Sequence, residues 1–118
     1  MNEYVMPYRN TRMGGLTQAI GVCPRCGVIR PYARRFSKAG THGEFFYNHE
    51  HALVFIVLER SNSGRNSYYI MGDVESGVRA LLEKIGGAWE KHMISVKEAF
   101  QELCRELGGP SEAEAGGR

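Results

Sequence analysis

The sequence has few cysteines and no long apolar run, and both shortages narrow the class of protein. Only three of the 118 residues are cysteine, and two of these, Cys23 and Cys26, are separated by just two residues. An odd count with such close spacing is a poor disulfide framework, so we expect a reducing, cytoplasmic environment. The longest apolar stretch, residues 52–58, has only the length of a strand. We therefore expect no membrane-spanning helix, and the first residues lack the pattern of a signal peptide.

What remains is the composition of one globular domain. Apolar residues make up 42% of the chain, which is enough for a real core in 118 residues but not for two independent cores. Residues 109–118 contain only Gly, Pro, Ser, Glu, Ala and Arg. This composition favours a disordered tail after a single domain that covers residues 1–108.

Strand patterns come first along the chain and helical patterns last. Residues 1–14 are punctuated by Pro7, Gly14 and other turn formers, and we expect them to be irregular. Runs rich in β-branched and aromatic residues predict strands at residues 16–22, 28–36, 44–60 and 67–72. The order predicts an α+β fold, a small antiparallel sheet with a zinc-knuckle hairpin followed by two C-terminal helices.

Two amphipathic helices are expected after residue 72. Asp73 is a good N-cap for the first helix, and Gly86-Gly87 is expected to end it. Ser95 and Glu98 have the spacing of a capping box at the start of the second helix. The apolar stripe of the first helix is Val78, Leu81, Leu82 and Ile85, and that of the second is Val96, Phe100, Leu103, Cys104 and Leu107.

A Cys-x-x-Cys turn is the motif with the most defined chemistry. In the segment Cys23-Pro24-Arg25-Cys26-Gly27, two thiolates can occupy two corners of one tetrahedron around Zn²⁺. Gly27 suits such a turn because glycine adopts positive φ without steric cost. The turn predicts a structural zinc site that needs two further ligands.

Histidines are the candidates to complete the site. Residues i and i+2 of a strand point to the same face, which favours His49 and His51 over His42 and His92. The predicted ligands are Cys23, Cys26, His49 and His51. Their spacing, C-x₂-C-x₂₂-H-x-H, differs from that of the ββα zinc finger. Two alternatives stay open: His42 with one histidine of the pair, or a site shared across a homodimer with two cysteines from each chain.

Enzymatic uses of the same residues fit the sequence less well. A thioredoxin-like dithiol should open a helix, but Gly27 is followed within a few residues by Pro31. A hydrolytic zinc enzyme needs an open metal position and a general base. Glu50 lies between the two histidines, but strand alternation points it to the other face. We therefore expect a protein that is not an enzyme.

Positive charge is concentrated in the first third of the chain. Residues 1–40 hold seven basic residues and one acidic residue, whereas residues 73–118 hold six basic and nine acidic residues. Arginines can bind phosphates, and aromatic rings such as Tyr32 and Phe36 can stack on unpaired bases. The predicted nucleic-acid-binding residues are Arg25, Arg30, Arg34, Arg35 and Lys38. The alternative is that both rings belong to the core and that the arginines are only a solvated rim.

The segment from Cys23 to Gly72 resembles small archaeal zinc-ribbon or zinc-knuckle proteins. The resemblance rests on the cysteine turn, on the aromatic run Phe45-Phe46-Tyr47-Asn48-His49 and on the returning segment Ser67-Tyr68-Tyr69-Ile70-Met71-Gly72. Zinc ribbons usually carry a second Cys-x-x-Cys pair, which this chain lacks. The resemblance implies zinc and a role in DNA or RNA binding related to transcription or mobile elements.

Together these features predict a zinc-stabilised nucleic-acid-binding protein whose partner is DNA or RNA. One alternative is a protein-interaction or assembly module with a structural zinc, in which the helices dock a partner or form a homodimer. A second alternative is a metal-dependent hydrolase or nuclease. Salt-dependent nucleic-acid binding separates the first hypothesis from the second.

Overall fold

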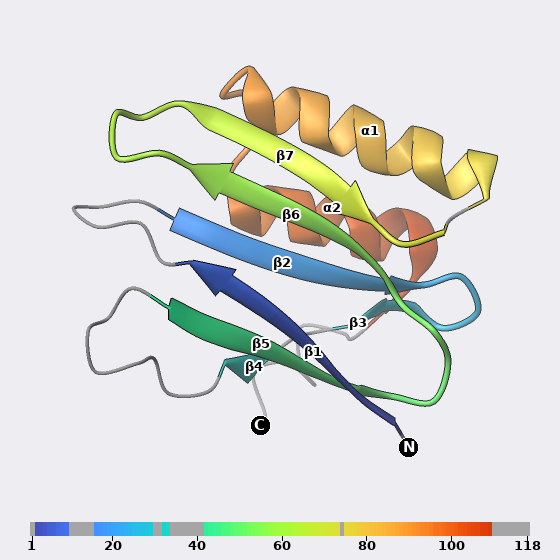
Figure 1. Ribbon diagram of the computed structural model, residues 1–118. Helices are drawn as coiled ribbons and strands as arrows, with labels where there is room; N and C mark the ends of the chain where they lie inside the picture. Colours follow the sequence, from blue (N-terminus) through green and yellow to red (C-terminus); the bar gives the residue numbers. More distant parts are fainter. Residues whose placement is uncertain (1, 10–15, 30–31, 34–41, 74, 110–118) are drawn as a thin grey trace.

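The computed structural model describes residues 2–9, 16–29, 32–33, 42–73 and 75–109. Within them, strands precede helices, and the predicted α+β class with two C-terminal helices is confirmed (Figure 1). The elements are β1 (Asn2–Arg9), β2 (Leu16–Cys23), β3 (Gly27–Ile29), β4 (Tyr32–Ala33), β5 (His42–His49), β6 (Val54–Arg60), β7 (Asn66–Met71), α1 (Ser76–Glu90) and α2 (Val96–Leu107).

The strands form two antiparallel sheets. The larger sheet has the order β3-β2-β6-β7, and the smaller has the order β1-β5-β4. Within the larger sheet, Val22 pairs with both Val28 and Val54, so β2 is the central partner of β3 and β6 at the end that carries Cys23. Helices α1 and α2 cover one face of the larger sheet (Figure 1).

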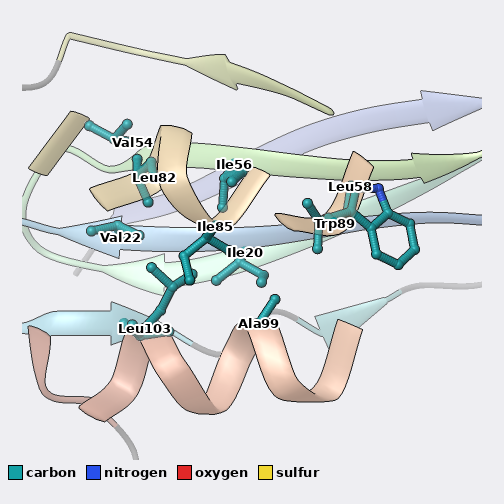
Figure 2. Packing of buried hydrophobic residues seen from close by; sticks show 11 residues of the cluster. Ile20, Val22, Val54, Ile56, Leu58, Leu82, Ile85, Trp89, Ala99 and Leu103 are labelled. Atoms are coloured by element: carbon teal, nitrogen blue, oxygen red, sulfur yellow. The ribbon is translucent and has the colours of Figure 1, made fainter. Parts of the chain in front are cut away.

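The helix-facing side of the larger sheet holds the main core. Figure 2 shows Leu82, Ile85 and Trp89 of α1 converging with Ala99 and Leu103 of α2 on the sheet. The sheet contributes alternate residues of β2 and β6, namely Ile20, Val22, Val54, Ile56 and Leu58. Each fully buried aliphatic side chain stabilises the fold by about 1.5–3 kcal/mol. The two predicted helical stripes therefore belong to one core.

The opposite side of the same strands packs against the smaller sheet. Ala19, Cys23 and Val57 are buried there together with Tyr47 of β5. A Cβ atom on Gly21 would lie 2.9 Å from the Cδ2 and Cε2 atoms of Tyr47, so glycine is needed for this close approach. Since side chains alternate along a strand, β2 contributes side chains to both cores, and Cys23 lies on the side of the smaller sheet.

A hydrogen-bonded cluster fixes α1 to the β6–β7 hairpin. The indole Nε1–H of Trp89 donates to the carbonyl oxygens of Ser67 at 2.9 Å and Glu59 at 3.2 Å. Asn66, only 5% exposed, donates from Nδ2 to the carbonyl oxygen of Trp89, and its Oδ1 accepts from Nε of Arg60. The side-chain polar atoms of Trp89 and Asn66 are thereby paired, as buried polar groups require.

Three strand predictions need correction. The expected strand over residues 44–60 is two strands in different sheets, because the chain turns at residues 50–53 between β5 and β6. The expected strand over residues 28–36 is likewise divided, since β3 pairs with β2 whereas β4 pairs with β5. The N-terminal segment, expected to be irregular, forms β1 through eight residue pairs with β5. All three observed strand arrangements depend on pairing with residues that are distant in sequence, which local patterns do not predict.

Two helix boundaries also differ from the prediction. The N-cap of α1 is Glu75 rather than Asp73, because the Glu75 side chain accepts a hydrogen bond from the N–H of Val78. Helix α1 continues through Gly86 and Gly87 to Glu90, since tertiary packing outweighs the weak helix propensity of glycine. The capping box of Ser95 and Glu98 and the end of α2 before Gly108 are confirmed. None of the described helices is both long enough and apolar enough to cross a membrane.

Candidate metal centre

Two chain segments distant in sequence meet at one end of the larger sheet. Cys23 is the last residue of β2, and Cys26 lies in the turn that leads to β3. His49 is the last residue of β5, and His51 lies in the β5–β6 connection. Figure 1 shows the β2–β3 turn and this connection at the same end of the molecule. One potential ligand atom from each of the four residues lies within 4.8 Å of the other three.

The distances around His51 fit tetrahedral coordination. Its Nδ1 lies 3.6 Å from Sγ of Cys23 and 3.4 Å from Sγ of Cys26. With Zn–S near 2.3 Å and Zn–N near 2.0–2.1 Å, the S···N edge of a zinc tetrahedron measures about 3.6 Å. Both S···N distances therefore match the edges of such a tetrahedron.

His49 presents a nitrogen that suits a metal ion. Its ring stands edge-on to that of His51, with centroids 5.2 Å apart. Its Nε2 is buried, and no described residue gives it a hydrogen bond. Partial removal from water, assisted by the neighbouring charge of His51, lowers the pKa of His49. A lower pKa favours the neutral ring, and a metal ion would supply the partner that Nε2 lacks.

The two thiols differ in their surroundings. Cys23 is 1% exposed, and its Sγ accepts a hydrogen bond of 3.4 Å from the backbone N–H of Arg25. Cys26 lies at the surface. Its pKa is raised by partial desolvation, by the hydrogen bond with Cys23 and by the charge of Cys23, and a smaller effect of Arg25 opposes this. A metal ion must displace the proton of Cys26, so metal binding here releases protons.

The structure brings together all four predicted ligands but corrects the reason given for the histidines. His49 and His51 do not share a strand face, because β5 ends at His49. They converge because the chain turns there, which places His51 beside both cysteines. His92, exposed after α1, and Cys104, packed against the helix-side core, are not in the group. The side chain of His42 lies outside the described residues.

The predicted nucleic-acid-binding residues are described only in part. Arg25 is exposed in the turn between the two cysteines, next to the ligand group. The other four predicted residues, Arg30, Arg34, Arg35 and Lys38, lie outside the described residues. Glu50 is exposed beside the histidines, and its negative charge acts on both Cys26 and His49.

Two contributors to the centre were not predicted from the sequence. One is the backbone N–H of Arg25, which lies two residues after Cys23 and donates to its Sγ. The other is Gly108, whose carbonyl oxygen accepts from the N–H of Val28 directly behind the cysteine turn. Gly108 is far away along the chain, and no local signal links it to the turn.

The donor set has a definite chemical preference. Two thiols and two imidazoles within one tetrahedron can hold a divalent cation of borderline softness, whereas Mg²⁺ and Ca²⁺ prefer oxygen ligands. This conclusion rests on the geometry of the chain itself. No protein-family model, no curated protein and no solved structure matches the sequence.

Proposed function

We propose that this protein binds one structural Zn²⁺ through Cys23, Cys26, His49 and His51. The observation that carries the proposal is the convergence of these four ligand atoms within 4.8 Å. Four protein ligands fill a tetrahedral site and leave no open position, which is typical of structural rather than catalytic zinc. The ion links the β2–β3 hairpin to the β5–β6 connection and so holds the two sheets together at this end.

The state of the cysteines agrees with this proposal. All three are free thiols, and the buried Cys23 and exposed Cys26 adjoin the histidines without a disulfide between them. Thiolate and imidazole ligands favour Zn²⁺ among the metals that are abundant in cells. Free thiols in this position suit a reducing compartment such as the cytoplasm.

Metal content is the direct test. Native mass spectrometry of the purified chain should find one zinc per chain, and Co²⁺ substitution should give the absorption of a tetrahedral, thiolate-bound ion. Half an equivalent of metal would instead indicate a site shared across a dimer. Absence of metal binding, with the exposed Cys26 open to alkylation in the folded protein, would reject the proposal.

We propose that the zinc-stabilised domain binds nucleic acid. Two observations favour this second step: the exposed guanidinium of Arg25 beside the metal centre and the excess of basic residues in the first third of the chain. Cationic side chains held near a rigid metal turn can neutralise phosphates without ordering a flexible loop. The protein-interaction module remains the competing proposal, and a metal hydrolase would need a free coordination position.

Binding of oligonucleotides at several salt concentrations tests this step. Fluorescence anisotropy with single-stranded DNA and RNA should show an affinity that falls with salt. Arg25→Ala should weaken binding and lower the salt slope by about one, as expected for one lost phosphate contact. Arg79→Ala is the matched control, since Arg79 is an exposed arginine on α1. Binding that is absent at low salt would favour the interaction module.

A further inference from the structure

The C-terminal end of α2 lies directly against β3, the short strand that follows the cysteine turn. Helix α2 ends at Leu107, where the N–H of Gly108 still donates to the carbonyl oxygen of Cys104. The carbonyl oxygen of Gly108 then accepts a hydrogen bond of 2.8 Å from the N–H of Val28. The chain after α2 therefore adds a partner to β3 on the edge that β2 leaves free.

Glycines on both sides make this approach possible. Gly27 has a φ of +94°, and a Cβ atom there would overlap the carbonyl group of Gly108. Gly109 has a φ of +151°, and a Cβ atom there would lie 2.9 Å from the carbonyl oxygen of Val28 and 3.0 Å from its Cβ. Both residues adopt a backbone conformation that other residues rarely reach, so the contact requires glycine at both positions.

The contact and the metal centre share one short segment of chain. Cys26 and Gly27 are adjacent, and Val28, only 1% exposed, packs in the helix-side core with Leu103 of α2. Strand β3 has three residues, paired with Gly21, Val22 and Cys23 of β2. So short a strand is marginal by itself, and its position depends on what holds its two ends.

We propose that metal loading of the centre controls the docking of residues 107–109 onto β3. This inference rests on the proposed metal site. The ion fixes Cys26 and thereby the start of β3, which presents the N–H of Val28 to Gly108. Without the ion, β3 loses this anchor and the end of α2 detaches from it. Because binding equilibria that are coupled are reciprocal, docking must strengthen metal binding by the same factor.

Hydrogen exchange of the full chain tests the first half of the coupling. The amide of Val28, which makes the docking hydrogen bond, should exchange at least about tenfold faster after chelation of Zn²⁺. The amide of Lys91, bonded to the carbonyl oxygen of Gly87 at the end of α1, is the internal control and should change much less. Equal protection of Val28 with and without metal would overturn the proposal.

The reciprocal effect, that docking strengthens metal binding, is tested by measuring the metal affinity of two glycine variants. This test also applies if chelation unfolds the whole chain. Gly109→Ala places a methyl group against Val28 and should weaken Co²⁺ binding about tenfold or more. Gly64→Ala is the matched control, since Gly64 also has positive φ (+91°) but no atom within 4 Å of the added Cβ. Its Co²⁺ affinity should stay close to that of the unmodified protein.

The outcomes separate the two proposals. If the unmodified chain binds no Co²⁺, the metal site itself is rejected. If it binds Co²⁺ and Gly109→Ala binds as tightly as Gly64→Ala, the metal site stands and the coupling to α2 is rejected.

Discussion

At the residue scale, the four ligands differ in how far the fold encloses them. Cys23 is buried, Cys26 is exposed, and the two histidines lie between these extremes. His51 occupies the central position because its Nδ1 is within 3.6 Å of both sulfur atoms. The Nε2 of His49 is buried and has no described hydrogen-bond partner. The centre is thus open at Cys26 and closed at Cys23, which makes Cys26 the point of entry for a chelator.

The central position of His51 yields a first prediction. His51→Ala should weaken zinc binding by about 10²-fold or more and remove the tetrahedral Co²⁺ spectrum, because three ligands remain. The matched control is His92→Asn. His92 is exposed and has a φ of +59°, which asparagine tolerates. Metal titration of both variants tests whether His51 is a ligand. Equal loss of metal affinity in both variants would contradict its assignment as a ligand.

Tyr47 carries a second prediction, about pH. Its hydroxyl is buried without a described partner, and burial raises the pKa of Tyr47 above its ordinary value. The folded state therefore keeps a proton that the unfolded state loses above about pH 10, so stability falls as pH rises past that value. Tyr47→Phe should remove this loss, which amounts to about 1.4 kcal/mol for each pH unit above 10.

Urea unfolding of both proteins at pH 7, 10 and 11 measures this effect. At pH 7 the variant should be as stable as the unmodified protein or more so, since no buried hydroxyl is left unpaired. Parallel loss of stability in the two proteins between pH 10 and pH 11 would show that Tyr47 is not the responsible group.

At the scale of elements, the contact between α1 and β7 explains why the helix does not stop at its two glycines. Gly86 is buried, and a Cβ atom there would overlap the ring of Tyr68 on β7. The neighbouring Gly87 has no atom within 4 Å of such a Cβ. Gly86 therefore permits helix and sheet to approach each other, whereas Gly87 only lowers the helix propensity of α1.

This difference gives a third prediction. Gly86→Ala should destabilise the fold by about 1–3 kcal/mol, because the ring of Tyr68 or the helix must shift. Gly87→Ala should instead stabilise it by about 0.5–1 kcal/mol through the better helix propensity of alanine. Thermal or urea unfolding of the two variants measures both effects. The same sign of change in both would mean that α1 does not pack on β7 as described.

At the scale of the whole molecule, the metal centre and the main core lie on different sides of the larger sheet. Trp89 is the only tryptophan of the chain, and it is buried among α1, β6 and β7. Cys23 belongs to the smaller cluster with Tyr47 and Leu53 on the opposite side. We therefore expect the helix-side core to persist when the metal is removed.

A fourth prediction follows for chelation. Removing zinc should lower the melting temperature by about 10 °C or more, because saturating metal stabilises the folded state by several kcal/mol. At 25 °C, however, the fluorescence of Trp89 should keep the emission of a buried indole. A red shift to that of an exposed indole on chelation would show that the whole fold, rather than one end of it, depends on the ion.

Much of this protein was determined by local sequence. The capping box at Ser95, the two apolar helical stripes and the cysteine turn all depend on residues within a few positions of one another. The four ligands could be predicted because their residue types restrict the choice to a few histidines. The strand over residues 16–22 and the helix over residues 96–107 also agree with the local pattern.

How these parts combine depends on contacts between residues that are distant in sequence. Local patterns could not show that the chain turns at residues 50–53, that β1 pairs with β5, or that α1 continues through Gly86. Each of these depends on a partner that is distant in sequence, and tertiary contacts then outweigh local propensity. The same holds for Gly108, which reaches Val28 only because α2 packs beside β3.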